Sequence, residues 1–131
     1  MKIVQLKIEN FRGIKSADLH FDGHALLVGP NNVGKSTICE ALDLVLGPDR
    51  LNKFPPVEEF DFYNGKYVEP KADTNADTKP IPIRIEVTLI ELSAEVLNRC
   101  KGHMEFWHVV EKRLLKHPCK NNQEQHPLFP K

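Results

Sequence analysis

The feature that most constrains the fold is a short stretch, GPNNVGKS, at residues 29–36. It matches the pattern G-x-x-x-x-G-K-[ST], which joins the end of a buried strand to the start of a helix. Both flanks fit that context: residues 25–28 form a continuous apolar run, typical of a central strand covered on both faces, and apolar residues recur at three- and four-residue steps through 35–46. The sequence therefore predicts a strand, a tight loop and an amphipathic helix in succession.

The residue types of this loop suit a polyphosphate. Glycines let the backbone turn successive N–H groups toward negative charge, and the positive N-terminal end of the helix adds to the same field. Lys35 is predicted to reach the β- and γ-phosphates of ATP, and the Ser36 hydroxyl to ligate Mg²⁺. The backbone amides of residues 32–37 are predicted to form the cradle. The full set of predicted nucleotide-binding residues in the loop and helix start is Gly29, Pro30, Asn31, Asn32, Val33, Gly34, Lys35, Ser36 and Thr37.

The segments around the loop have contrasting patterns. Residues 2–9 end in the alternation of a half-buried strand, residues 10–13 (NFRG) form a turn, and residues 17–21 alternate again before a hairpin-like Asp-Gly pair. Prolines interrupt residues 48–80, which predicts an irregular insertion whose aromatic residues fold its first half back onto the body. A strand, a loop-helix unit and an irregular insertion are therefore expected in this order.

The last third of the chain is less regular. Residues 81–92 return to strand alternation, and Ser93 is expected to cap a short helix that ends at Cys100. Residues 105–115 are ambiguous between strand and helix, and the polar tail 117–131 is expected to be loose.

Composition narrows the class of protein. The chain has 131 residues, a length typical of one domain or part of one, and 18 Lys and Arg balance 18 Asp and Glu, which argues against a basic footprint over the whole chain. No apolar run approaches the ~20 residues of a membrane span, and the first residues break their apolar stretch too often for a signal peptide. Three widely spaced cysteines indicate reduced thiols. We expect a cytoplasmic protein without a membrane partner.

Two stretches together resemble a known family. The pattern I-x-x-L-x-I-E-N-F-R-G-I at residues 3–14, followed by LLVGPNNVGKST at 26–37, resembles the N-terminal lobe of the RecF/SMC-type ABC ATPases, and within them most resembles the OLD-family (overcoming lysogenization defect) ATP-dependent nucleases. The resemblance implies an antiparallel N-terminal sheet beside the phosphate loop. It also implies that Arg12 lies close to bound nucleotide or to DNA, and that the ATPase works as a head-to-head dimer or with a partner ATPase subunit.

The resemblance defines the expected fold class: an α/β P-loop NTPase (ABC-ATPase-like) N-terminal lobe, with a mixed sheet, antiparallel N-terminal strands and a Walker A helix. The expected organisation is one partial domain over residues 1–131, divided into strands with loop and helix (1–47), insertion (48–80), strand and short helix (81–116) and tail (117–131). The function implied is ATP and Mg²⁺ binding in DNA processing, repair or phage defence.

The chain departs from that group in its catalytic motifs. We find no glutamine loop, signature motif, Walker B Asp-Glu pair or nuclease domain in the sequence. No catalytic set is complete here, because phosphoryl transfer also needs a positioned water. We therefore expect an N-terminal part of a longer protein or a truncated form, whose hydrolysis requires those motifs and a dimer.

Two other function classes stay open. One is a non-catalytic interaction subunit whose pairing is tuned by nucleotide. The other is a small P-loop kinase, which needs an Arg-rich lid, whereas residues 49–80 hold only Arg50.

Several smaller constellations have both a functional and a purely structural interpretation. Two thiols and two imidazoles supply a ligand set for zinc, or a packed cysteine with solvated histidines: Cys100, His103, His117 and Cys119. Three carboxylates offer a second metal site or a solvated loop: Glu58, Glu59 and Asp61. A basic strip offers phosphate-backbone contacts or ordinary surface: Lys112, Arg113, Lys116 and Lys120. Cys39 is expected to be a small core residue, and Trp107 to fill core rather than stack a base.

Overall fold

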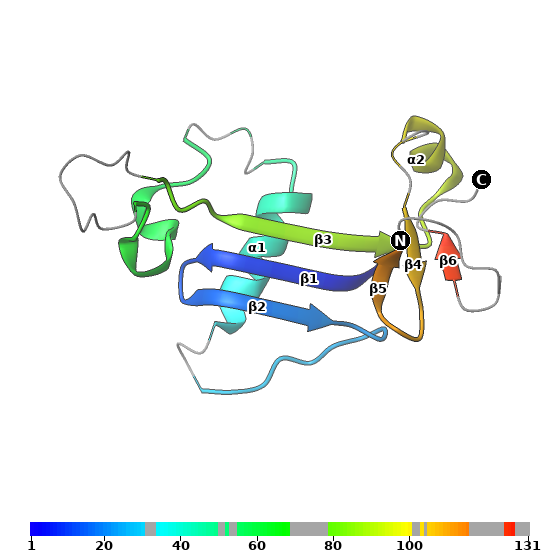
Figure 1. Ribbon diagram of the computed structural model, residues 1–131, viewed down its shortest axis with the longest axis horizontal. Helices are drawn as coiled ribbons and strands as arrows, with labels where there is room; N and C mark the ends of the chain where they lie inside the picture. The colour runs from blue at the N-terminus through cyan, green and yellow to red at the C-terminus, as the bar shows by residue number, and fades with distance from the viewer. Residues whose placement is uncertain are drawn as a thin grey trace. The chain divides into compact units, whose positions relative to one another are not determined.

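The structure is a computed structural model that describes residues 1–30, 34–49, 52, 55–68, 79–100, 103, 105–115 and 125–127. Its main sheet has three strands in the order β2-β1-β3, and β1 runs antiparallel to both neighbours (Figure 1). These strands are β1 (Lys2–Phe11), β2 (Ile14–His20) and β3 (Arg84–Ile90). The predicted strands at 2–9 and 81–92 are confirmed with changed bounds, and the architecture is α/β. The turn predicted at 10–13 is shorter, at 12–13, because Asn10 and Phe11 belong to β1.

The chain divides into two compact units. One contains residues 1–5, 20–24 and 88–131, and the other contains residues 6–19 and 25–87. Within the described ranges, neither helix has the length and apolar character that a bilayer span requires.

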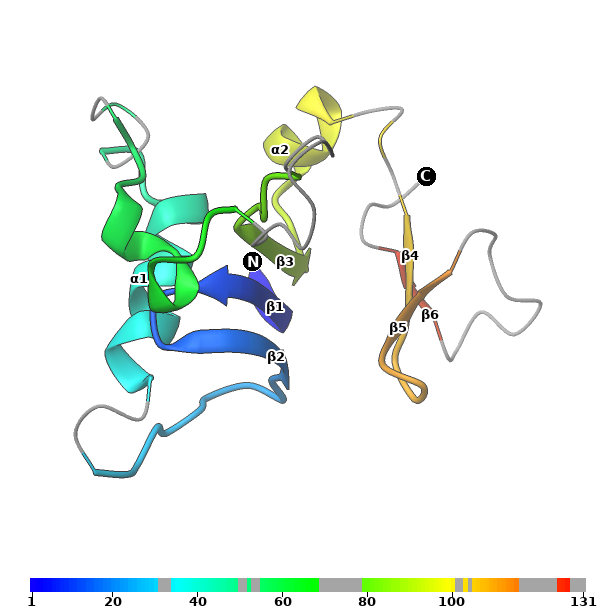
Figure 2. The ribbon, with the colours of Figure 1, turned by 60° about the vertical axis from the view of Figure 1, so that its left-hand side comes forward.

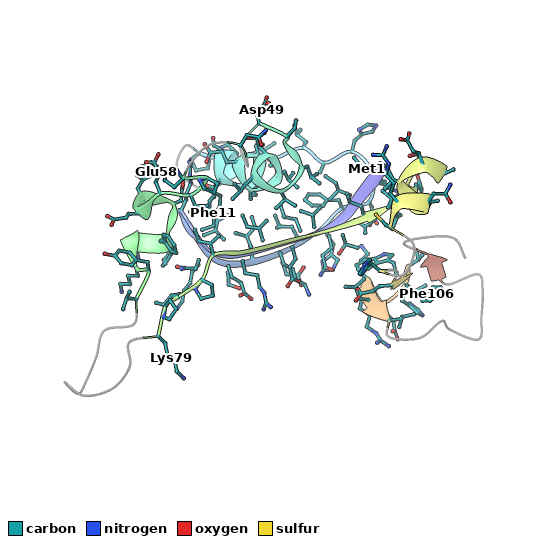
Figure 3. All side chains as sticks on the ribbon, turned by 90° about the horizontal axis from the view of Figure 1, so that it is seen from above. Met1, Phe11, Asp49, Glu58, Lys79 and Phe106 are labelled. Carbon is teal, nitrogen blue, oxygen red and sulfur yellow. The ribbon has the colours of Figure 1, made fainter. Side chains whose placement is uncertain are left out.

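The core of the unit formed by residues 6–19 and 25–87 lies between the main sheet and one helix. Leu6, Ile8 and Phe11 of β1 are fully buried. The two-residue period shifts at Asn10, which has a positive φ of 55°, so Phe11 is buried in place of Asn10. Helix α1 (Lys35–Leu46) covers this face, and side chains fill the space between helix and sheet (Figure 3).

Helix α1 has the bounds that its apolar spacing predicts. Ala41 and Leu44 are its buried residues, three positions apart on one face. The helix ends where Gly47 N–H donates to Asp43 O at 2.8 Å, and Pro48 follows, which lacks the N–H for a further turn. Cys39 is exposed, so its prediction as a core residue is wrong: it lies on the side of α1 away from the buried pair.

The apolar run before the phosphate loop differs from its prediction. Residues 25–28 were expected to form a covered central strand, but they lie outside every strand of the described residues. Leu26, Leu27 and Val28 are 87%, 39% and 81% exposed. A strand of this kind needs a hydrogen-bonding neighbour, and among the described strands none pairs with it.

The insertion packs through its first half. Two short 3₁₀ turns, η1 (Glu59–Asp61) and η2 (Tyr63–Gly65), follow one another, and Phe62 between them forms an antiparallel bridge with Phe11. The Phe62 ring lies edge-on to Tyr67, with centroids 6.0 Å apart. These contacts confirm that part of the aromatic set returns to the sheet, although Phe60 stays 67% exposed and Phe54 lies outside the described residues.

The other unit contains a second small sheet, visible in Figure 2, with the order β5-β4-β6. Its strands are β4 (Phe106–His108), β5 (Arg113–Leu115) and β6 (Gln125–Pro127), and they pair antiparallel. The ambiguous stretch 105–115 is therefore a hairpin, and a strand lies in the segment expected to be loose. Trp107, 3% exposed, is buried with Val4 and Ile90, which confirms its interpretation as core.

Helix α2 (Ala94–Arg99) begins after Ser93, as predicted. Its first bond joins Leu97 N–H to Ser93 O at 3.0 Å. The Ser93 hydroxyl makes no capping bond, so the predicted side-chain cap is not formed.

Candidate functional site

The candidate site is the phosphate loop, which we define as residues 29–36, together with the start of α1. Of this loop the structure describes Gly29, Pro30 and residues 34–36, while Asn31, Asn32 and Val33 lie outside the described residues. Gly34 caps the helix with φ 89° and ψ 6°, a left-handed conformation. Glycine adopts it without the steric cost that a Cβ imposes, so the second glycine of the motif is required by the backbone itself.

The start of α1 carries positive potential. The first helical hydrogen bond runs from Ile38 N–H to Gly34 O at 3.0 Å, so the amides of Lys35, Ser36 and Thr37 have no acceptor within the helix. No acidic residue occupies the first turn. The partial charge of these amides is therefore not neutralised by the helix's own side chains, and it favours an anion at this end.

Lys35 lies over the loop. Its Nζ donates to Gly29 O and to Pro30 O, each at 2.5 Å. The ammonium group of Lys35 is thus hydrogen-bonded to the first two carbonyl oxygens of the phosphate loop. Ser36 is exposed, so its hydroxyl is accessible to solvent, and Thr37 is half-buried.

Arg12 has a different environment from the phosphate loop. It lies in the β1–β2 turn with a positive φ of 48°. Its Nε donates to Asp61 Oδ1 at 2.7 Å, and its Nη1 donates to Glu40 Oε2 on α1. Burial lowers the pKa of Arg12, but the hydrogen bond to Asp61 and the charges of Glu40 and Asp61 outweigh burial and raise it above its ordinary value. The guanidinium is engaged by two carboxylates within its own unit.

A cavity of about 280 Å³ lies beside this ion-pair cluster, and no described residue of the phosphate loop lines it. Among the described residues that line the cavity, Arg12 is the basic one, and four are carboxylates: Asp43, Asp49, Glu58 and Asp61. The charge of these described lining residues is negative on balance, which disfavours a polyphosphate in the cavity.

The metal hypotheses gain no support from the described residues, where no group of three or more His, Cys, Asp or Glu could hold an ion. Asp61 faces Arg12 and also accepts from Glu58 N–H at 3.0 Å, so the three carboxylates of the insertion are not free to converge. Two of the four predicted zinc ligands, His117 and Cys119, lie outside the described residues.

The basic strip is largely occupied by local ion pairs. Lys112 Nζ donates to Asp22 Oδ2 at 2.9 Å, and Arg113 Nε donates to Glu111 Oε2 at 2.5 Å. Lys116 and Lys120 lie outside the described residues. These pairs favour the interpretation of the strip as ordinary surface.

Comparisons with known proteins agree with the motif. Residues 1–127 match the family described as AAA ATPase domain. Shorter stretches are similar to an OLD nuclease from Thermus scotoductus (46% identity over 43 residues, 33% of this chain and 8% of the relative). They are also similar to a DNA double-strand break repair Rad50 ATPase from Methanopyrus kandleri (47% over 53 residues, 40% and 6%) and a DNA replication and repair protein RecF from Mannheimia succiniciproducens (51% over 43 residues, 32% and 12%). The matched stretches therefore span only 6–12% of the relatives' own lengths.

Proposed function

Because the chain belongs to the AAA ATPase domain family, we propose that its phosphate loop and the start of α1 bind ATP together with Mg²⁺. One observation carries the proposal: the left-handed Gly34 opens a helix whose first turn holds no acidic residue, with the Lys35 ammonium at the same loop. Positive partial charges, a full positive charge and an unobstructed backbone are what a polyphosphate requires.

Each described residue has a distinct role in this proposal. Lys35 exchanges the carbonyl oxygens of Gly29 and Pro30 for the β- and γ-phosphates, which as full anions attract an ammonium more strongly. The Ser36 hydroxyl, exposed at the helix start, is the ligand for Mg²⁺. Mg²⁺ supplies charge neutralisation between the phosphates when bound. The backbone amides of residues 32–37 form the cradle, as the motif predicts.

The names of the relatives suggest the biological setting. An OLD nuclease, a Rad50 ATPase and a RecF protein all share short stretches with this chain. We propose that the chain is a nucleotide-binding lobe in DNA processing or repair, with phage defence as a further possible setting for an OLD-like protein. Hydrolysis then requires a Walker B pair, a signature motif and a dimer or partner subunit, since these motifs are not found in this sequence.

A second candidate function has one observation in its favour. Residues 25–28 stay exposed beside the phosphate loop, and exposed apolar patches commonly mark interaction sites. In this alternative the lobe pairs with another subunit and nucleotide tunes the pairing without turnover.

The proposal is tested by calorimetry with ATP·Mg²⁺. Lys35→Ala is expected to lose most of the affinity, at least about tenfold or ~1.4 kcal/mol, while keeping the wild-type melting temperature, because the lysine faces solvent and loop and not core. Lys66→Ala, which removes an exposed lysine of the insertion, is the matched control and should bind like the wild type.

Equal affinities of the wild type and Lys35→Ala would overturn the assignment. Turnover separates the two candidate functions: hydrolysis that appears only with added full-length partner supports the ATPase lobe, whereas nucleotide-dependent pairing without turnover supports the interaction subunit.

A further inference from the structure

Arg12 joins three elements that lie far apart in sequence. Its backbone N–H donates to Asp61 O at 2.7 Å, its Nε donates to Asp61 Oδ1 at 2.7 Å, and its Nη1 donates to Glu40 Oε2. The β1–β2 turn, the 3₁₀ turn η1 and helix α1 therefore meet at one guanidinium. We call Arg12, Glu40 and Asp61 the arginine bridge.

We propose that the arginine bridge positions α1, and through α1 the phosphate loop, so that Asp61 in the insertion sets the affinity for polyphosphate without touching it. This inference rests on the proposed function. Glu40 lies four residues after Ser36 on the same helix, one turn along. Holding Glu40 fixes the rotation of α1 about its axis, which determines where the first-turn amides and the Ser36 hydroxyl point.

Burial makes Asp61 the anchor of the bridge. Its side chain is 4% exposed, whereas those of Arg12 and Glu40 are 26% and 34% exposed. Its second oxygen, Oδ2, accepts from Glu58 N–H at 3.0 Å, so the carboxylate is fixed on both sides. A carboxylate held in this way orients the guanidinium, and the guanidinium then orients Glu40.

The planar fork of arginine is essential to this arrangement. Two nitrogens of one guanidinium reach carboxylates on different elements, and an ammonium group on a flexible stem does not reproduce that geometry. Within the bridge, Arg12 acts on the loop through Glu40, as a positioning residue.

The experiment compares Asp61→Asn, Glu40→Gln and Arg12→Lys with the control Glu59→Gln, which removes an exposed carboxylate from the same 3₁₀ turn. Affinity for ATP·Mg²⁺ is measured by calorimetry at a temperature where every variant is folded. Hydrogen exchange of the amides of residues 38–44 is measured in the nucleotide-free proteins, with the β3 amides as an internal reference.

The three bridge variants are expected to bind ATP·Mg²⁺ about tenfold more weakly than the wild type, and Glu59→Gln like the wild type. Exchange in α1 should rise in the bridge variants while exchange in β3 stays unchanged. Should Asp61→Asn fail to fold, Glu40→Gln tests the same bridge from its more exposed end.

If Arg12→Lys bound ATP·Mg²⁺ with wild-type affinity, the proposal would be overturned, because the planar fork of arginine would be unnecessary. An equal rise of hydrogen exchange in α1 and in β3 would also overturn it, because it would indicate general destabilisation. If the wild type itself does not bind ATP·Mg²⁺, the proposed function fails, and with it the proposal that the arginine bridge sets the affinity for nucleotide. The exchange of α1 in the nucleotide-free variants then decides whether the bridge positions the helix.

Discussion

At the scale of single residues, Gly34 sets the geometry of the loop. Its φ of 89° is a conformation that L-residues with a Cβ adopt at a cost of about 1–2 kcal/mol. Space is not the obstacle, since an added Cβ lies 3.4 Å from Ile14 Cγ1, an ordinary contact. Gly34→Ala is therefore expected to lower the free energy of unfolding by about that amount, measured by urea denaturation.

Gly13 provides the matched control for this substitution. It lies in the β1–β2 turn, its φ is outside the left-handed region, and an added Cβ meets nothing within 4 Å. Gly13→Ala should be neutral or stabilise by up to about 1 kcal/mol, since it restricts only the unfolded chain. Equal stabilities of the two variants would contradict the steric account of Gly34.

Single residues also mark how far the sequence alone can predict the site. The phosphate loop can be proposed from the sequence because the spacing of its motif is local. The partners of Arg12 could not, because Glu40 and Asp61 lie 28 and 49 positions away: Glu40 meets it through the packing of α1, and Asp61 only after the insertion folds back. Ion pairs between charged residues of such separation carry no periodic signal, and Asp61 resembled any other carboxylate of an acidic loop.

At the scale of elements, the same apolar patterning succeeded for α1 and failed for residues 25–28. A helix satisfies its own backbone, so the spacing of Ala41 and Leu44 is enough to place it against the sheet. A strand does not, because its hydrogen bonds belong to neighbours. The run at 25–28 has the composition of a covered strand, but no described strand pairs with it. The strand β6 was not predicted, because its own residues show no strand alternation and it forms by pairing with β4.

The β4–β5 hairpin is tied to the end of β2 by a pH-dependent contact. His20 Nε2 lies 3.2 Å from Lys112 O, and Lys112 Nζ donates to Asp22 Oδ2 at 2.9 Å. This hydrogen bond, with the charge of Lys112, lowers the pKa of Asp22. A lowered folded-state pKa means that the stabilisation is present above the ordinary carboxyl pKa of 3.8 and is lost as the pH falls below it.

NMR titration of the Asp22 carboxyl tests this contact. Lys112→Met is expected to raise the pKa of Asp22 toward its ordinary value, because it removes the donor and the charge together. The effect on stability should be small, since the Asp22 side chain is 82% exposed and that of Lys112 is 43% exposed. Lys66→Met, in the other unit, is the control, and an unchanged Asp22 pKa in Lys112→Met would refute the contact.

At the scale of the whole molecule, the family match covers nearly all of the chain, while the matched relatives are many times longer than the stretches they share with it. This sequence holds the phosphate loop with its lysine and serine, and no Walker B pair is found in it. The exposed apolar run at residues 25–28 directly precedes this loop in the sequence.

That run is expected to govern how the chain behaves in solution. Leu26 and Val28, 87% and 81% exposed, belong to an apolar stretch that pairs with none of the described strands, and such stretches associate with one another. We expect the chain to self-associate as its concentration rises, measured by sedimentation velocity. Leu26→Lys combined with Val28→Lys should shift it toward monomer, with stability changed by no more than about 0.5 kcal/mol because the replaced side chains bury little surface.

Val110 separates the effect of this run from that of surface hydrophobicity in general. It is 71% exposed in the turn between β4 and β5, away in sequence from the loop. Val110→Lys adds the same single charge as Leu26→Lys alone, at a similarly exposed position, so unlike Leu26→Lys it should leave the self-association unchanged. A chain that stays monomeric at all concentrations would contradict the expectation outright. If Val110→Lys also shifted the chain toward monomer, the association would be assigned to net charge. Association through residues 25–28 of two copies should instead depend on where the charge is placed.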